Sequence, residues 1–311
     1  MSSVESSNVK TPTVSIGMPV YNDQEYVSQA LDSLLAQSFE DFELIISDNA
    51  STDRTKEICQ EYAEKDRRIR YIRQPINLGP HANSSYLLRQ AAGEFFMWAA
   101  SDDLWDKEFI RTLISALRTG ERCASAFSPF LSIDENANPI SETQSYDYSG
   151  RNVLLRVLKF CHYYNDAFFY GLHRIQLIKD VKIPVWWWIN SKITTNCAYP
   201  VLLYFLACGM YVQAGESPLW LNRLHLNSQP RHGNQFQDRH LIGYLAFLLQ
   251  KINLLYESVR YVYLGRRSIP ITLATTPILA TRVLYDCLLG TSNRIFASIR
   301  LLRRWVRKHF R

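Results

Sequence analysis

The sequence predicts an α/β fold with a mostly parallel sheet, and three observations support this prediction. Short apolar runs alternate with amphipathic helical patterns through the first half of the chain, as they do in repeated strand–helix–strand units. Two of these runs, 44–47 and 95–100, are almost continuously apolar, which is typical of parallel strands buried on both faces. Hydrophobic residues make up 47% of the 311 residues and charged residues 21%, so the chain is neither disordered nor fibrous.

The predicted elements follow one another at regular intervals. Strands are expected at 14–20, 42–47, 69–73 and 94–100, with a further extended run at 123–133. Helices are expected at 26–34, 55–65, 82–92 and 107–119, where apolar residues recur at helical spacing.

The stretch 193–215 contains no charged residue and is long enough to suggest a membrane span. Only 201–207 is densely apolar, however, and Pro200 and Gly209 interrupt the stretch. We therefore expect a buried helix that ends near Gly209 and is followed by a strand.

Charge and cysteine content restrict the class of protein. Residues 292–311 carry seven Lys and Arg and no acidic residue, while the rest of the chain has 28 basic against 29 acidic residues. A nucleic-acid-binding protein normally spreads positive charge over its folded domain, so this class is disfavoured. The six cysteines lack metal-ligand spacing and the first ten residues lack an apolar core, so we expect a cytoplasmic protein.

Small polar or acidic side chains follow each of the first four predicted strands. The carboxyl ends of parallel strands are where ligands bind in such sheets. Asp102 and Asp103 directly follow the fourth strand, and two adjacent carboxylates at the rim of a buried sheet are costly unless a cation or a hydroxyl-rich ligand neutralises them. A capping and turn role is the alternative. Glycine motifs for dinucleotides or a P-loop are absent, which favours a nucleotide bridged by a metal ion.

Four separated segments follow one another along the chain: VSIGMPVYNDQEYVSQALDSLLAQSFEDFELIISDNASTDRT, YIRQPINLGPHANSSYLLRQAAGEFFMWAASDDLW, FFYGLHRIQLI and GMYVQAGESPLWLNRLH. Together they resemble the inverting family 2 glycosyltransferases of GT-A fold. The resemblance covers roughly residues 11–228 and implies a GT-A domain there, after a disordered segment 1–10 and before a helical extension 229–311. It implies an enzyme of polysaccharide biosynthesis that transfers a sugar from a nucleotide-diphosphate donor to a glycan or lipid-linked acceptor with inversion, using Mn²⁺ or Mg²⁺.

The resemblance also implies roles for individual residues. The residues expected to bind the nucleotide sugar are Pro19, Tyr21, Asn22, Asp48, Ser51, Asp53, Asn83, Asp102 and Arg223. Asp103 is expected to bind the metal, with Asp102 sharing it and His225 beside it. Asp53 is also expected to cap the following helix, because Asp is a preferred N-cap residue.

The sequence departs from the family at the catalytic base. The family carries an acid at the segment that corresponds to 194–199, and this chain has none there. Asp166, Asp180 and Glu216 bracket the segment, and we predict that Asp166 is the base. Many members also carry an extra acid where this chain has Ala100. The alternative is a non-catalytic protein of glycosyltransferase-like fold that binds a nucleotide sugar or a glycan.

The C-terminal residues carry apolar stripes. Helices are expected at 240–263, and residues 292–311 form a candidate amphipathic helix with arginines around an apolar stripe. This composition suits a helix that lies on an anionic membrane surface. We expect that surface to be the cytoplasmic face of the membrane. The alternative is a helix that packs on its own domain.

Overall fold

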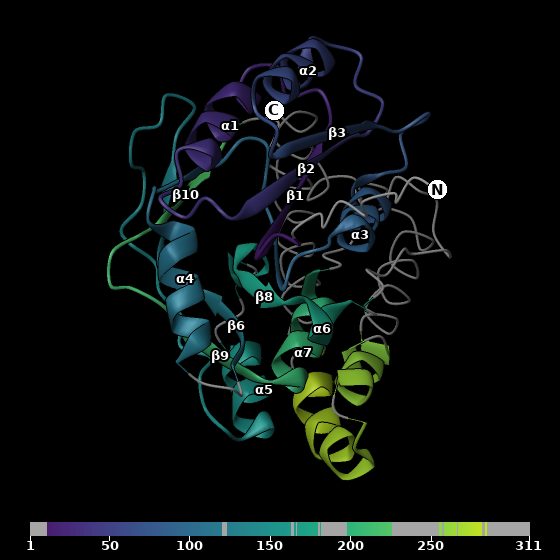
Figure 1. The fold of residues 1–311 in the computed structure, drawn as a ribbon. Coiled ribbons are helices and arrows are strands. Elements are labelled where there is room, and N and C mark those ends of the chain that lie inside the picture. Colours follow the sequence, from purple (N-terminus) through teal and green to yellow (C-terminus); the bar gives the residue numbers. More distant parts are fainter. Residues whose placement is uncertain are drawn as a thin grey trace, which may run out of the picture.

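The central sheet of the protein has seven strands in the order β3-β2-β1-β4-β8-β6-β9 (Figure 1). The structure is a computed structural model that describes residues 11–119, 123–162, 165, 167–179, 181, 198–225, 255–256, 258–265, 267–281 and 284. The strands are β1 (Val14–Val20), β2 (Phe42–Asp48), β3 (Ile69–Arg73), β4 (Phe95–Trp98), β6 (Cys123–Phe127), β8 (Leu172–Arg174) and β9 (Met210–Gln213).

The pairing of these strands is mostly parallel. β1 lies parallel to both β2 and β4, β2 lies parallel to β3, and β6 lies parallel to β9. β8 runs antiparallel to both β4 and β6, so it joins the two parallel groups into one sheet. The predicted α/β fold with a mostly parallel sheet is confirmed.

Helices cover both faces of the sheet. One face packs against α1 (Val27–Leu35), α2 (Thr55–Lys65) and α4 (Phe109–Arg118), and the other against α3 (Pro80–Gln90), α5 (Val153–His162) and α7 (Ala198–Cys208). Along β4, Phe95 and Met97 enter the first core while Phe96 and Trp98 enter the second. Successive side chains of a strand point to opposite faces, which is why this run is apolar throughout.

A second, three-stranded sheet lies beside the main one. Its order is β5-β10-β7, with β5 at Leu104–Trp105, β10 at Trp220–Arg223 and β7 at Phe130–Ile133. β10 pairs antiparallel with β5 and parallel with β7. This pairing brings the segment around Arg223 next to the residues that follow β4.

The predicted elements agree with most of the observed ones. The helix and strand expected around Gly209 are confirmed as α7 and β9. α3 begins at Pro80, two residues earlier than predicted, because proline suits the first turn of a helix. The single extended run predicted at 123–133 is wrong, since Ser128 and Pro129 separate β6 from β7. The short helices η1 (Ala167–Tyr170) and α6 (Ile175–Ile178) flank β8.

Toward the C-terminus, residues 258–265 and 269–281 are helical. The predictions for residues 1–10, for 240–254 and for the tail 292–311 fall on residues outside those that the structure describes. In the described part of the chain, none of the helices combines the length and the apolar character needed to cross a bilayer.

We expect the substitution Gly93→Ala to destabilise the fold. A Cβ atom at position 93 would lie 2.7 Å from the backbone nitrogen of Ser15 and 2.9 Å from the carbonyl carbon of Val14. Both atoms belong to the central strand β1, which is unable to move without breaking its pairing to β2 and β4. Overpacking of this kind costs about 1–3 kcal/mol. Denaturant unfolding measures this loss, and an unchanged midpoint would contradict the packing described for β1.

Candidate functional site

The loops that follow β1 and β2 are tied to each other at the carboxyl end of the sheet. Asn22 donates from its backbone N–H to Ser51 Oγ at 3.1 Å and accepts a hydrogen bond from the Thr52 N–H at 2.8 Å. Asn22 and Ala50 have φ angles of 56° and 62°, in the left-handed region that asparagine tolerates better than most residues. The predicted site residues Asn22 and Ser51 therefore lie side by side.

Asp53 also links these two loops. Its Oδ2 accepts a hydrogen bond from the Gln24 N–H at 3.2 Å, and its Oδ1 accepts one from the N–H of Thr55 at 3.0 Å. Thr55 is the first residue of α2 and Arg54 occupies the N-cap position, so Asp53 lies one residue before the cap position predicted for it, although its carboxylate accepts a hydrogen bond from the first N–H of the helix. Its predicted contact with a nucleotide sugar stays a prediction.

Asp48 is a fully buried carboxylate at the end of β2. Its Oδ1 accepts a hydrogen bond from the Ser51 N–H at 2.8 Å, and its Oδ2 accepts one from Tyr71 and one from Arg73, both at 2.6 Å. Burial raises the pKa of Asp48, but these hydrogen bonds outweigh it, so the carboxyl titrates below its ordinary range. The side chain of Arg73 is 37% exposed, and it adds a cation to the region predicted to bind the nucleotide sugar.

The sequence analysis did not single out Tyr71 or Arg73. The sequence does contain a pattern that could have identified them: Tyr71 and Arg73 are two residues apart on β3, so their side chains point to the same face of the strand. Arg73 also lies directly opposite Asp48 in the β2–β3 register.

Asn83 is buried and faces the interior. Its side-chain NH₂ donates to the backbone carbonyl of Ser47 at 2.9 Å, and its Oδ1 accepts from the Ser47 hydroxyl at 2.5 Å. This pair ties α3 to the end of β2. The arrangement favours a supporting role for Asn83 over the predicted contact with a nucleotide sugar.

Asp103 is held in the interior between the two sheets. Its Oδ2 accepts a hydrogen bond from Trp220 Nε1 at 2.9 Å, and its Oδ1 accepts one from the backbone N–H of Arg223 at 2.8 Å. The residue is 3% exposed. Burial and the neighbouring Asp102 raise the pKa of Asp103 well above its ordinary value, against the lowering effect of the two N–H donors. Both oxygens accept hydrogen bonds from β10, which gives Asp103 a structural role, and its predicted metal contact stays a prediction.

Asp102 faces His225 at the surface of the site. Asp102 Oδ2 and His225 Nε2 lie 2.9 Å apart, with the carboxylate side chain 20% exposed and the imidazole 5% exposed. The ring of Tyr26 packs against that of His225 at 4.6 Å. The structure thus brings together two of the three residues predicted to bind a metal.

Asp23, in the loop after β1, lies beside this pair. Its carboxylate accepts a hydrogen bond from Ser101. Burial raises the pKa of Asp23, and the charge of Asp102 adds to this effect while His225 opposes it. The sequence places Asp23 at the end of a strand, but only the fold shows that it faces Asp102.

The described residues supply too few donors to hold a divalent ion alone, and a bound diphosphate would have to supply the others. Carboxylate oxygen and imidazole nitrogen are both donors that Mn²⁺ accepts. Within the described part of the chain, however, no group of three or more His, Cys, Asp or Glu side chains is arranged around one point. Asp102 and His225 would therefore hold such an ion with the remaining positions open to oxygens of a bound diphosphate.

The guanidinium of Arg223 donates its hydrogen bonds to other groups of the protein. Nε donates to the backbone carbonyl of Asp102 at 2.7 Å, and the terminal nitrogens donate to the carbonyl of Glu135 at 2.6 Å and to Gln29 Oε1 at 2.8 Å. Its Cζ lies 4.9 Å from the ring centroid of Tyr26, within cation–π range. Arg223 is 1% exposed, so it fixes the Asp102 backbone and does not face the site, in contrast to its predicted contact with a nucleotide sugar.

The remaining predicted residues lie at the edge of the site or outside the described residues. Pro19 lies near the end of β1, and Tyr21 is exposed directly after that strand. Their predicted contacts with a nucleotide sugar stay predictions. Asp166, the predicted catalytic base, lies outside the residues that the structure describes.

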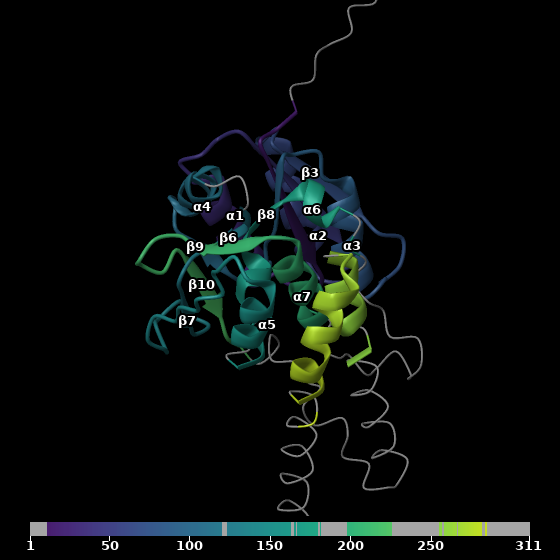
Figure 2. The same cartoon turned by 90° about the horizontal axis from the view of Figure 1, so that it is seen from below.

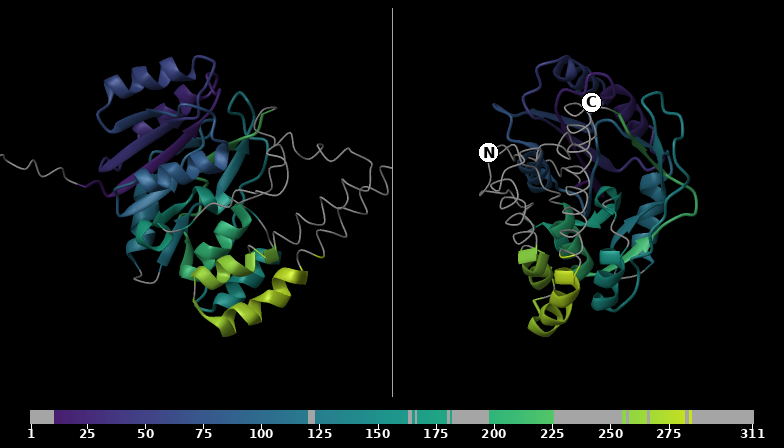
Figure 3. Two further views of the ribbon diagram at one scale, coloured as in Figure 1. Left: turned by 90° about the vertical axis from the view of Figure 1, so that its right-hand side faces the viewer. Right: turned by 180° about the vertical axis from the view of Figure 1, so that it is seen from behind.

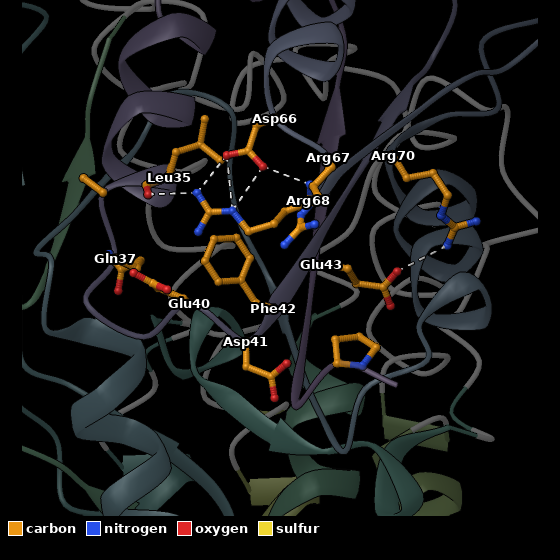
Figure 4. Close-up of a pocket in the computed structure, with 12 residues that line it drawn as sticks. Leu35, Gln37, Glu40, Asp41, Phe42, Glu43, Asp66, Arg67, Arg68 and Arg70 are labelled. Carbon is orange, nitrogen blue, oxygen red and sulfur yellow. Dashed lines mark hydrogen bonds and ion pairs between the residues drawn. The ribbon is translucent and has the colours of Figure 1, made fainter. Parts of the chain in front are cut away.

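A pocket of about 1020 Å³ lies at the opposite end of the strands, near the start of β1 and β2 (Figure 4). Four of its charged groups form two ion pairs: Arg68 binds Asp66 at 2.8 Å, and Arg70 lies 3.8 Å from Glu43. None of the predicted site residues lines this pocket. We therefore assign the functional site to the carboxyl end of the sheet.

We expect the substitution Asp103→Asn to destabilise the protein. Asparagine offers one oxygen where two N–H donors need acceptors, so its NH₂ group would face a donor. An unsatisfied buried donor costs roughly 1–3 kcal/mol. Chemical denaturation measures the loss, and the exposed Glu142→Gln serves as control with an expected change within about 0.5 kcal/mol. Equal or higher stability of the Asp103 variant would contradict the hydrogen bonding described here.

Comparisons with known proteins agree with the fold. Chondroitin synthase of Escherichia coli is 30% identical over 162 residues, which are 52% of this chain and 23% of that protein. The GalNAc(5)-diNAcBac-PP-undecaprenol beta-1,3-glucosyltransferase of Campylobacter jejuni is 34% identical over 110 residues, or 35% of this chain and 36% of that protein. The chain thus spans well under two thirds of the length of these curated relatives.

A solved structure shows the same fold. The crystal structure of S. aureus TarS 1-349 in complex with UDP-GlcNAc superposes with a TM-score of 0.58 at 19% identity, over 79% of this chain and 66% of that chain. The family model described as glycosyl transferase family 2 matches residues 15–191, which include Asp48, Asp102 and Asp103. This chain therefore belongs to glycosyl transferase family 2.

Proposed function

We propose that this protein transfers a sugar, with inversion, from a nucleotide-diphosphate donor to a hydroxyl group of a glycan or lipid-linked acceptor. The reaction uses Mn²⁺ or Mg²⁺. The observation that carries this proposal is the pairing of Asp102 with His225 at 2.9 Å. This pair lies on the same rim of the sheet as the buried Asp48, where the loops after β1, β2 and β4 meet.

The donor nucleotide would bind across the loops after β1 and β2. Asp48, held by Tyr71 and Arg73, presents a fixed charge pair at the floor of this region, and the exposed ring of Tyr21 offers an apolar surface beside it. Aromatic rings are suited to stacking on a flat base. The TarS structure contains UDP-GlcNAc, which supports a nucleotide sugar as the donor for this chain.

Asp102 and His225 would hold the divalent ion. When bound, this ion stabilises the charge that develops on the leaving nucleoside diphosphate. The chain contributes by fixing the two ligands beforehand: Asp103 and Arg223 hold the backbone around Asp102, and Tyr26 packs on the His225 ring. Groups that are positioned in advance need no reorganisation during the reaction.

Inversion requires an acceptor hydroxyl to attack the anomeric carbon from the face opposite the leaving group, with a base that removes its proton. Asp166 remains our proposal for this base. The names of two relatives support the acceptor class, since one is a chondroitin synthase and the other acts on an undecaprenol-linked glycan. A cytoplasmic location is part of the same proposal.

Donor binding tests the proposal most simply. We expect calorimetry to detect binding of one of UDP, GDP and dTDP that depends on Mn²⁺, and the substitution Asp102→Ala to weaken it at least about tenfold, because a metal ligand is lost. The exposed Glu142→Ala is the control and should bind as the wild type does. Binding by none of the three nucleotides would contradict the proposal.

Turnover measured on the same samples distinguishes an enzyme from a protein that only binds a nucleotide sugar or a glycan. The lack of a carboxylate in 194–199 favours the second candidate, a non-catalytic binder of nucleotide sugars or glycans. We expect the wild type to release nucleotide from the corresponding nucleotide sugar when an acceptor glycan is added, and Asp102→Ala to do so far more slowly. Tight donor binding without any turnover would favour the non-catalytic candidate.

A further inference from the structure

Large apolar side chains that remain exposed gather on two helical regions of the described chain. Nine of the fourteen lie on α5 or in residues 255–284, and five lie elsewhere. The nine are Leu154, Leu155, Leu158, Tyr256, Tyr263, Leu264, Ile269, Leu273 and Leu284. Single exposed apolar residues are ordinary, but a contiguous set marks an interaction surface.

The two regions meet at a shared groove. A groove of about 390 Å³ is lined by Leu154 and its neighbours at the start of α5 and by Pro270, Ile271 and Ala274 of the helix 269–281. The two helices lie side by side at one end of the molecule in Figures 2 and 3, where α5 is teal and the C-terminal helices are yellow-green.

Each of these helices is apolar on both its inner and its outer side. On α5, Val153, Val157 and Phe160 enter the core, while Leu154 and Leu158 point outward and are 37% and 49% exposed. On the helix 269–281, Leu279 is buried while Ile269 and Leu273 are 63% and 66% exposed. A helix whose only role is to cover a core carries polar residues on its outer side, so the apolar outer side of these helices favours an interaction surface.

Positive charge predominates in the C-terminal part of the sequence, and exposed arginines lie next to both helices. Residues 229–311 contain fourteen Lys and Arg against three Asp and Glu, whereas residues 1–228 contain 21 against 26. Among the described residues, Arg151 precedes α5 and Arg267 precedes the helix 269–281, and both are exposed. α5 itself contains no acidic residue.

We propose that this surface binds the face of an anionic lipid bilayer. We define the docking face as Leu154, Leu155, Leu158, Ile269 and Leu273. Apolar side chains at the acyl boundary with basic groups at the level of the headgroups are the arrangement by which proteins bind such bilayers peripherally. A second copy of the chain would bring like charges together without acidic partners, which is unfavourable.

This docking face differs from the amphipathic tail predicted at 292–311, although both carry the same sign of charge. The face belongs to helices that pack on the catalytic-domain core through α7 and residues 255–265. It would therefore hold the folded domain itself against the bilayer. The proposal does not depend on transferase activity, because binding to lipid involves neither a donor nor an acceptor.

Vesicle sedimentation tests the proposal. The full chain, without nucleotide, is mixed with vesicles of equal parts phosphatidylcholine and phosphatidylglycerol, or of phosphatidylcholine alone. We expect binding to the anionic vesicles only, and a loss of roughly tenfold or more in the double variant Leu158→Glu, Leu273→Glu, because both charges oppose insertion and the negative surface. Both side chains are exposed, so the variant is expected to fold.

The control is Ile140→Glu, which changes a side chain that is 54% exposed but lies on neither helix. It should bind vesicles as the wild type does. A second variant, in which Arg303, Arg304, Arg307 and Lys308 become Gln, measures the contribution of the tail and should retain binding to the anionic vesicles. Unchanged binding by the double variant would overturn the proposal, as would a wild-type dimer that the double variant breaks without any binding to vesicles.

Discussion

The buried carboxylate of Asp103 is the interaction on which the functional site depends. A charged group in the interior costs several kcal/mol unless its oxygens are paired, and here both are paired with N–H donors of β10, from Trp220 and Arg223. These donors lie 117 and 120 residues further along the chain. Because the hydrogen bonds fix β10 against the loop after β4, His225 arrives beside Asp102. One buried group thus sets the position of two residues that face the ligand.

The same principle holds across the rest of the site. Its polar side chains are mostly occupied by one another: Asn22 joins the first two loops, Asp48 is held by Tyr71 and Arg73, and Arg223 holds the backbone of Asp102. A buried network whose members are all paired is rigid. Precise positioning before a ligand binds is what catalysis by electrostatic stabilisation requires. These contacts therefore position the side chains of the site more than they bind the ligand directly.

Much of this fold follows from sequence patterns. Which residues of the site face the ligand and which hold the structure together does not. The strand and helix pattern of the first half and the adjacent pair Asp102 and Asp103 are local signals, since periodicity and strand ends are visible in a few residues. The inward orientation of Asp103 is different, because it depends on a strand more than one hundred residues away. The same is true of Arg223 and Asn83, whose residue types suit a ligand contact but whose side chains the fold turns inward. The antiparallel insertion of β8 between β4 and β6 is likewise a long-range pairing that no local pattern encodes.

The most direct test compares two tryptophans that lie opposite each other in the small sheet. Trp220 donates a hydrogen bond from its Nε1–H to Asp103, whereas the Nε1–H of Trp105, also buried, has no hydrogen-bond partner among the described residues. Calorimetry would measure the Mn²⁺-dependent affinity of Trp220→Phe and Trp105→Phe for whichever of UDP, GDP and dTDP the wild type binds. Both variants lose similar packing, so we expect Trp220→Phe to weaken binding at least about tenfold more than Trp105→Phe does. Equal affinities in the two variants would contradict the role assigned to Asp103.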